Sequence, residues 1–176
     1  MLSPMIHMTD REKLTFAKLQ SLKIPYEAIS HPPMMTMEDC AAADIERFGD
    51  TGHCKNIFLC NKQETAFYLL LIEAHKRFRT AEVSKEIGST RLGFGSHEQL
   101  LKLLNLTPGS VTPLGLMFDT SHQVKLLVDK DLFRHERILV HPCVNTGTVC
   151  MKTRDLFEVF MPSTGHAVTP VTVSHD

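Results

Sequence analysis

The sequence lacks the run of about 20 consecutive apolar residues that a membrane-spanning helix needs. Its opening, MLSPMIHMTDREK, has neither a basic start nor a continuous apolar centre, so we expect no secretory signal. It also lacks an excess of charge of either sign, because it contains 19 Lys and Arg and 20 Asp and Glu. This balance excludes a strongly basic nucleic-acid coat but is compatible with a local phosphate-binding patch. The sequence therefore predicts a soluble, cytoplasmic protein without membrane attachment.

Several catalytic motifs are missing as well. No C-x-x-C or H-E-x-x-H spacing occurs, and the adjacent His53 and Cys54 are awkward ligands for one tetrahedral ion, so we expect no metal. No serine stands in a G-x-S-x-G elbow, which argues against a serine hydrolase. The stretch LGFGSHEQL has Glu98 where a dinucleotide fingerprint needs its third glycine. The cysteines are odd in number and irregularly spaced, which indicates reduced thiols. We expect no cofactor.

The elements that the sequence does predict alternate irregularly between helix and strand. Helices are expected at 8–23, 36–48, 80–88, 96–106 and 153–161, and the first, second and fourth open with capping-box spacings. Strands are expected at 26–30, 56–60, 66–72, 91–95, 123–129, 136–142 and 145–151, the second and third as a hairpin. Residues 107–115 are expected to form a turn-rich loop.

No linker or repeat divides the 176 residues, so we predict a single domain, 1–176, with a core at about 9–161 and a polar tail, 162–176. The predicted fold class is α/β, of the α+β type: a mixed, largely antiparallel sheet surrounded by helices.

Four polar residues stand where predicted strands meet loops. Lys55 and Asn56 precede the apolar run IFLC, Arg91 precedes LGFG, and His141 follows RILV. Such junctions are a common location for functional side chains. Each of these residues alone is more commonly solvated or stabilises a turn, so position by itself does not assign a function.

Four segments closely resemble, in order and spacing, the prolyl-tRNA editing superfamily (the YbaK/ProX-like proteins). They are GHCKNIFLCNKQETAFYLLLI, STRLGFGSHEQLLKLL, LTPGSVTPLGL and ILVHPCVNTGTV. The resemblance implies the aminoacyl-tRNA deacylase fold of that superfamily and metal-independent hydrolysis of mischarged aminoacyl-tRNA. The HPP start and the GH-x-KN block most resemble the subgroup that removes alanine from proline tRNA. Deacylation of cysteinyl- or seryl-tRNA, and a non-catalytic role in binding tRNA or a synthetase, remain alternatives on the same scaffold.

The resemblance also assigns three catalytic residues. Lys55 matches the motif lysine, whose ammonium suits a phosphate near the tRNA terminus. Asn56 can hold a ribose hydroxyl or the ester carbonyl through its amide. His141, in the H-P-x-x-N segment, can orient the ribose hydroxyl or water. We expect Lys55 and Asn56 to face one pocket that receives the 3′ acceptor end.

A second set of residues is expected to bind the tRNA and the amino acid. Glycines let the backbone of 109–115 approach the substrate, and a proline stiffens it. The set comprises Arg91, Gly109, Ser110, Thr112, Pro113, Gly115 and Asn145. Candidates to line a small amino-acid pocket are Met34, Met35, Leu114 and Leu116, which a plain core role explains equally well. The expected partners are the 3′ acceptor end of aminoacyl-tRNA and prolyl-tRNA synthetase.

Overall fold

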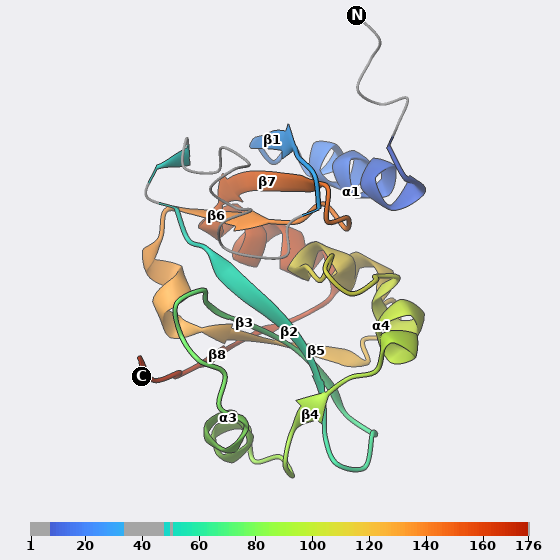
Figure 1. The fold of residues 1–176 in the computed structure, drawn as a ribbon. Coiled ribbons are helices and arrows are strands. Elements are labelled where there is room, and N and C mark those ends of the chain that lie inside the picture. The colour runs from blue at the N-terminus through green and yellow to red at the C-terminus, as the bar shows by residue number, and fades with distance from the viewer. Residues whose placement is uncertain (1–7, 34–47, 50, 176) are drawn as a thin grey trace, which may run out of the picture.

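The structure, a computed structural model, describes residues 8–33, 48–49 and 51–175, and its strands form two sheets (Figure 1). The larger sheet has the strand order β4-β2-β3-β5-β8. Its strands are β2 (Cys54–Cys60), β3 (Phe67–Glu73), β4 (Gly93–Phe94), β5 (Val124–Asp129) and β8 (Val168–Val171). β2 pairs antiparallel with β3 and β4, whereas the pairs β3–β5 and β5–β8 are parallel. The predicted hairpin of β2 and β3 is confirmed.

The smaller sheet is antiparallel and has the order β1-β7-β6. Its strands are β1 (Tyr26–Ser30), β6 (Arg137–Val140) and β7 (Gly147–Lys152). It meets the larger sheet at an isolated parallel bridge between Gly52 and Ile138. Because the bridge is parallel, β2 and β6 leave it in the same direction. The predicted fold class is confirmed, with the strands divided between two sheets.

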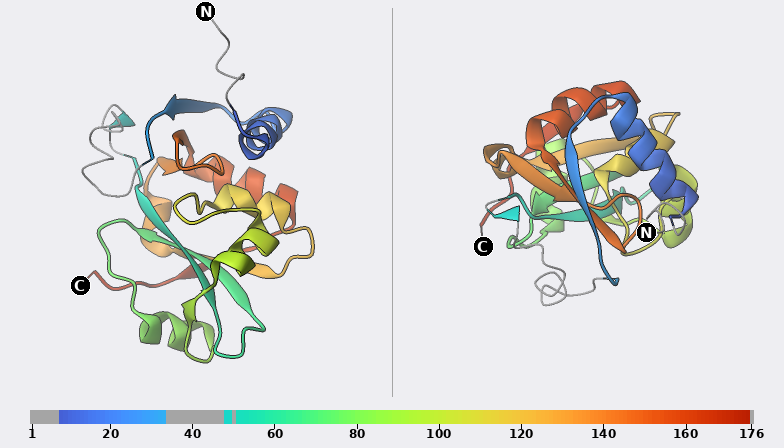
Figure 2. Two further views of the ribbon diagram at one scale, coloured as in Figure 1. Left: turned by 45° about the vertical axis from the view of Figure 1, so that its right-hand side comes forward. Right: turned by 90° about the horizontal axis from the view of Figure 1, so that it is seen from above.

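Local sequence signals mark the start of two helices and the end of a third. α1 (Asp10–Ser21) and α4 (His97–Leu104) both open with the predicted capping boxes, and α3 (Thr80–Ile87) ends at a left-handed Gly88. Figure 2 shows α1 beside the smaller sheet and α3 at the opposite end of the protein. The last predicted helix is longer than expected and consists of α5 (Thr153–Asp155), a π-helical turn η5 (Leu156–Phe160) and α6 (Met161–Thr164). The helix predicted at 36–48 lies, except for its last residue, outside the described residues.

Alternation along β2 and β3 builds two hydrophobic cores. Phe58, Leu69 and Leu71 belong to the larger core, which also contains side chains of the smaller sheet and of the helices. Leu59 and Leu70 lie on the opposite faces of their strands and belong to the smaller core. The larger core therefore joins the two sheets and fixes β2 relative to β6. Within the described residues, no helix is long and apolar enough to cross a membrane.

The C-terminal segment is not the polar tail that the sequence predicted. β8 pairs with β5, and the carbonyl of Val173 accepts a 2.9 Å hydrogen bond from the Lys76 ammonium. That ammonium is fully buried and forms ion pairs of 2.9 Å with Asp129 and 2.7 Å with Asp131. The segment therefore completes both a sheet edge and the hydrogen bonds of a buried charge.

Candidate active site

Lys55 and Asn56 leave β2 on opposite faces. Successive side chains of a strand alternate, and the neighbours of these two residues reveal the faces. Cys54 and Phe58, on the face of Asn56, pack in the larger core, whereas Ile57, on the face of Lys55, packs against the smaller one. The expectation that Lys55 and Asn56 face one shared pocket is therefore wrong.

Lys55 is exposed, and its ammonium is anchored at the end of the hairpin. Its Nζ donates a 2.7 Å hydrogen bond to the carbonyl of Lys76, in the turn after β3. The N–H of Lys76 in turn donates to the carbonyl of Glu73. An ammonium has three donors, and the described residues use one of them. Lys55 therefore keeps two donors for a further acceptor while the turn holds it in place.

Asn56 shares its face of β2 with Cys54, whose thiol contacts β6. Its Oδ1 accepts a hydrogen bond from the Cys54 thiol (3.9 Å), which also lies 3.7 Å from the carbonyl of Leu139. Burial raises the pKa of the Cys54 thiol to about 12, so this thiol stays neutral at physiological pH. Among the described residues, the amide nitrogen of Asn56 has no hydrogen-bond partner. Asn56 therefore keeps its N–H donors for a ligand.

His141 directly follows β6, and its ring is held in one orientation. Its Nδ1 lies 3.0 Å from the carbonyl of Gly147, which can only accept, so Nδ1 carries the proton and Nε2 presents a lone pair. Burial lowers the pKa of His141 from its usual 6.5, and the neighbouring His31 lowers it further, whereas the Gly147 carbonyl raises it. His141 is thus a neutral imidazole near pH 7, and its Nε2 has no hydrogen-bond partner among the described residues.

His31 supports this arrangement, and the sequence analysis did not single it out. Its Nδ1 lies 2.8 Å from the carbonyl of Pro32 and its Nε2 lies 2.7 Å from Oγ1 of Thr148. Both side chains are buried. His31 therefore fixes the start of β7, whose Gly147 carbonyl orients His141. The HPP sequence was the available signal, but nothing local links it to a residue more than a hundred positions later.

The loop at 107–112 contacts the turn that carries His141. A Cβ built on Gly109 would lie 3.6 Å from Nδ2 of Asn145, and Gly109 has a φ of +86° that favours glycine. Asn145 lies in the turn between His141 and β7. Gly109 thus lies beside Asn145, and β2 runs parallel to β6, which ends just before His141. Four of the predicted residues therefore lie toward one end of the two sheets: Asn56, Gly109, His141 and Asn145.

The other residues of this stretch stabilise the loop through hydrogen bonds and packing. Ser110 Oγ donates a 2.7 Å hydrogen bond to the carbonyl of Thr107, and Thr112 caps the 3-10 helix η3 (Pro113–Phe118). A Cβ on Gly115 would lie only 2.6 Å from Cδ1 of Leu106, so this glycine permits close packing. Buried positions in this stretch are Ser110, Thr112, Pro113, Leu114, Gly115 and Leu116. Leu114 and Leu116 belong to the core, and Met34 and Met35 lie outside the described residues.

Arg91 lies apart from this group. Gly93 of β4 pairs with Cys60, so Arg91 stands beyond the C-terminal end of β2, while Lys55 stands near its beginning. Lys55 and Cys60 are five residue steps apart along β2, which corresponds to roughly 16 Å. Arg91 lines a surface hollow there together with Lys62. Arg91 can therefore contact only a different part of a large substrate.

Comparison with known proteins decides the family. Residues 31–159 match the model of the aminoacyl-tRNA editing domain. The chain belongs to the aminoacyl-tRNA editing domain family. It is 34% identical over 150 residues to the prolyl-tRNA editing protein ProX of Acetoanaerobium sticklandii, covering 85% of this chain and 90% of that protein. It is 31% identical to prolyl-tRNA synthetase associated domain-containing protein 1 of Danio rerio, covering 90% of this chain and 84% of that protein.

A solved structure of a candidate trans-editing enzyme for prolyl-tRNA synthetase has the same fold. Its TM-score is 0.69 at 16% identity, with 95% of this chain and 99% of that chain covered. Family membership places this editing-domain protein among the aminoacyl-tRNA deacylases, with aminoacyl-tRNA as the substrate.

Proposed function

We propose that this protein hydrolyses mischarged aminoacyl-tRNA in trans, in the cytoplasm and without a metal, and that alanyl-tRNA(Pro) is its preferred substrate. The observation that carries the proposal is a neutral His141 after β6, together with Asn56 on the neighbouring β2; among the described residues, Nε2 of His141 and the amide nitrogen of Asn56 have no hydrogen-bond partner. Ester hydrolysis needs a placed water or ribose hydroxyl and a donor for the developing oxyanion. His141 supplies the acceptor that places the water or hydroxyl, and Asn56 supplies the donor.

His141 provides the acceptor. With its proton held on Nδ1 by Gly147, its Nε2 takes a hydrogen bond from the ribose 2′-hydroxyl or from the attacking water. Asn56 provides a donor to the ester oxygen, where negative charge gathers in the tetrahedral intermediate. Asn145 and the open backbone of Gly109 border the same end of the sheets, where the terminal adenosine and its amino acid would lie.

Lys55 contributes from the neighbouring face of β2. Its ammonium, anchored on the Lys76 carbonyl, has two donors left for a phosphate of the acceptor end. Arg91 and Lys62 lie farther along and would meet the tRNA backbone outside the reacting centre. The acceptor end of tRNA is thus the main partner. Prolyl-tRNA synthetase is the second, supported by the name of the Danio rerio relative.

Selectivity for alanine requires a small amino-acid pocket. A single methylene is worth only about 1–3 kcal/mol in an apolar pocket, so binding cannot favour a small amino acid strongly over a larger one. A pocket too small for proline excludes it sterically instead. In the described residues no group of three or more His, Cys, Asp and Glu side chains is arranged to hold an ion. The chelator test below decides whether a metal takes part.

The test is deacylation of alanyl-, cysteinyl-, seryl- and prolyl-tRNA(Pro), each with and without a strong chelator. Wild type should hydrolyse the alanyl ester fastest and leave the prolyl ester intact, and its rate should be the same with and without the chelator. Lys55→Ala should lose most of this activity, whereas Lys102→Ala, which removes an exposed lysine on α4, should not. Faster loss of cysteine or serine would refute the alanine preference. Inactivation by chelator would refute metal independence, and no turnover of any ester would refute the enzyme.

A further inference from the structure

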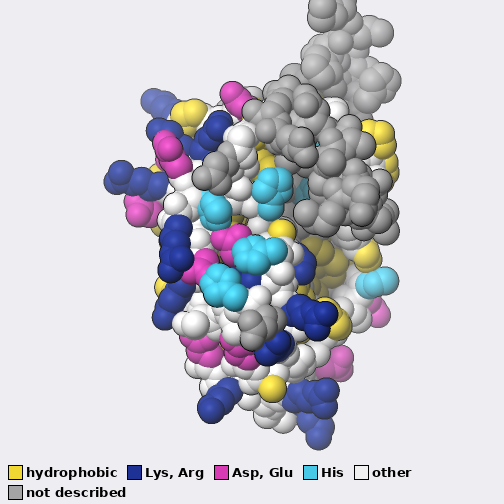
Figure 3. All heavy atoms as spheres, turned by 60° about the vertical axis from the view of Figure 1, so that its left-hand side comes forward, with side chains coloured by type: hydrophobic (Ala, Val, Ile, Leu, Met, Phe, Trp, Pro, Cys, Tyr) yellow, Lys and Arg dark blue, Asp and Glu magenta, His cyan; other side chains and the backbone are white. Residues whose placement is uncertain are grey.

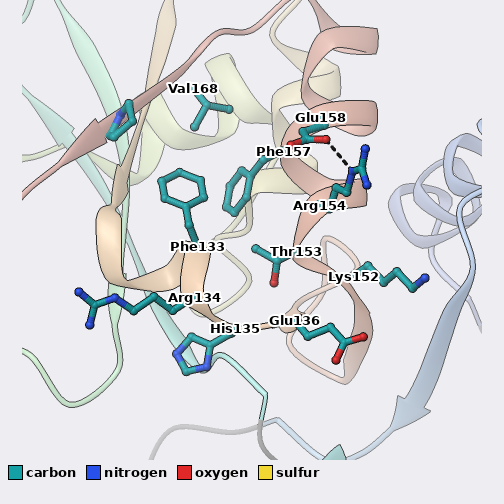
Figure 4. Close-up of a pocket in the computed structure, with 11 residues that line it drawn as sticks. Phe133, Arg134, His135, Glu136, Lys152, Thr153, Arg154, Phe157, Glu158 and Val168 are labelled. Atoms are coloured by element: carbon teal, nitrogen blue, oxygen red, sulfur yellow. Dashed lines mark hydrogen bonds and ion pairs between the residues drawn. The ribbon is translucent and has the colours of Figure 1, made fainter.

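A cavity of about 700 Å³ lies outside the candidate active site (Figure 4). It is bounded by the 3-10 helix η4 (Lys130–Arg134), the start of α5, η5 and the edge strand β8. Its volume is within the range of sites that hold small ligands or parts of larger ones. None of the residues predicted from the sequence lines it, and the proposed hydrolysis does not use it.

The inner wall of this cavity is aromatic. The rings of Phe133 and Phe157 meet edge to face with centroids 5.1 Å apart, and Val168 and Pro170 extend the apolar surface. Phe133 is 39% exposed although it stands in a concave site. A partly exposed aromatic ring in a hollow offers a flat stacking surface, and any nucleobase can stack on such a ring.

The rim of the cavity is mainly cationic. Arg134, Lys152 and Arg154 line it, against the carboxylates of Glu136 and Glu158. The two arginine side chains are 80% and 82% exposed, and each uses only part of its guanidinium in an ion pair, Arg134 with Asp131 and Arg154 with Glu158. A guanidinium has five donors, so both arginines keep donors for phosphate. Aromatic wall and cationic rim together suit a nucleotide better than an apolar peptide.

A chain of hydrogen bonds leads from the cavity to Lys55. His135 lines the cavity, and its Nε2 lies 2.6 Å from Oε1 of Glu73. Glu73 lines a second hollow, of about 490 Å³, together with Thr51, His53, Ala74 and His75. The backbone of Glu73 holds Lys76, whose carbonyl receives the ammonium of Lys55. Figure 3 shows histidines gathered on one face of the protein with Lys and Arg around them.

The spacing fits a single-stranded acceptor end. Glu136 stands just before β6 and His141 just after it, a separation of five residue steps or roughly 16 Å. Three stacked nucleotides rise about 10 Å, and splayed nucleotides reach farther. If the terminal adenosine lies at His141, the unpaired nucleotides before it can reach the cavity.

We propose that this cavity binds the base of one of the unpaired nucleotides that precede the terminal adenosine of tRNA. The base stacks on Phe133, and the adjoining phosphates contact Arg134 and Lys152. The inference rests on the proposed function in so far as it takes the terminal adenosine to lie at His141. The cavity thereby recognises the single-stranded end of the tRNA independently of the amino acid.

The first test is direct binding, which needs no turnover. A labelled single-stranded oligonucleotide ending in ACCA should bind wild type, and Phe133→Ala should weaken it roughly 5- to 100-fold, the range for the loss of one stacked base. Phe133→Leu, which keeps apolar packing but removes the flat ring, should weaken it as well. Adenosine alone should show no such difference. Leu101→Ala, which truncates an exposed apolar residue on α4, is the matched control.

The second test separates this proposal from the proposed function. Phe133→Ala should raise the KM for aminoacyl-tRNA by the same factor without a matching change for aminoacyl-adenosine, which lacks the upstream nucleotides. Equal oligonucleotide affinity in wild type and both Phe133 variants would overturn the proposal. So would weaker binding of prolyl-tRNA synthetase by these variants with unchanged oligonucleotide affinity, which would assign the cavity to a protein partner. Absence of deacylation by wild type, with oligonucleotide binding still dependent on Phe133, would overturn only the proposed function.

Discussion

The neutral state of His141 predicts the acid side of the activity profile. Its Nδ1 proton is held by the Gly147 carbonyl, and burial lowers its pKa from 6.5. The free enzyme should therefore be fully active near pH 7, and kcat/KM should fall only when the pH drops below 6.5 and Nε2 becomes protonated. The same lowered pKa favours the neutral form in the folded state. Folding stability attributable to His141 is thus present above pH 6.5 and is lost as the pH falls through the folded pKa.

His141→Gln removes the titrating group and keeps a polar side chain. If Nε2 takes a proton in the transition state, kcat should fall by about 10²- to 10⁴-fold, and the acid limb of the profile should vanish. The assay is single-turnover deacylation between about pH 5 and 8, where histidine titrates. His97→Gln, at an exposed position on α4, is the control. A variant that keeps the acid limb would refute the assignment of that limb to His141, and a variant within threefold of wild type would refute its part in the reaction.

Three further changes test the support of the fold and site. Lys76→Met should destabilise the protein by about 3–5 kcal/mol in urea unfolding, because it leaves Asp129 buried and unpaired; a loss under 1 kcal/mol would contradict the buried pair. Thr153→Val should leave stability unchanged or raise it by up to about 1 kcal/mol, since Oγ1 of Thr153 is buried without a partner in the described structure; marked destabilisation would mean that the hydroxyl is bonded. Thr148→Val should cost about 1–3 kcal/mol and lower kcat more than it changes KM, because it leaves Nε2 of His31 unpaired; an unchanged kcat would separate His31 from His141.

The elements predicted correctly are those that depend on local chemistry. The capping boxes at Thr9 and Ser96 involve partners three residues away, and Gly88 ends α3 by its own left-handed conformation. The hairpin of β2 and β3 needs only a short turn between two apolar runs. None of these requires knowledge of the distant chain, so sequence pattern is sufficient.

The elements that were missed depend on distant partners. β8 contains a proline and two exposed residues and looks like a tail, yet it pairs in parallel with β5, which lies about forty positions earlier. Lys76 has the sequence environment of a solvated lysine. In the fold it is buried and forms ion pairs with Asp129 and Asp131, more than fifty positions later. The parallel pairing of β5 with β3 and β8 could not be predicted either, because strands that pair over long sequence distances leave little local signal.

The candidate site contains both correct and incorrect predictions. The resemblance selected Asn56, His141, Gly109 and Asn145, which the fold does bring to one end of the sheets. It also placed Lys55 beside Asn56 in one pocket, although strand alternation alone puts neighbouring side chains on opposite faces. Arg91 was grouped with the site by motif order, and only the pairing of β4 with the far end of β2 separates it.

The orientation of His141 comes from backbone geometry. A Cβ on Gly147 would lie 3.1 Å from Cγ of Pro142 and 3.4 Å from the carbonyl of Ile29, so this glycine is wedged between β1 and the residue that follows His141. Its carbonyl therefore has little freedom, and neither does the imidazole that donates to it. Gly147→Ala should accordingly displace the ring without touching any catalytic atom. A displacement of about 1 Å can cost on the order of 100-fold in rate, so kcat should fall while the acid limb of the pH profile remains. An unchanged kcat in a folded Gly147→Ala variant would show that the position of the imidazole does not depend on the close packing at residue 147.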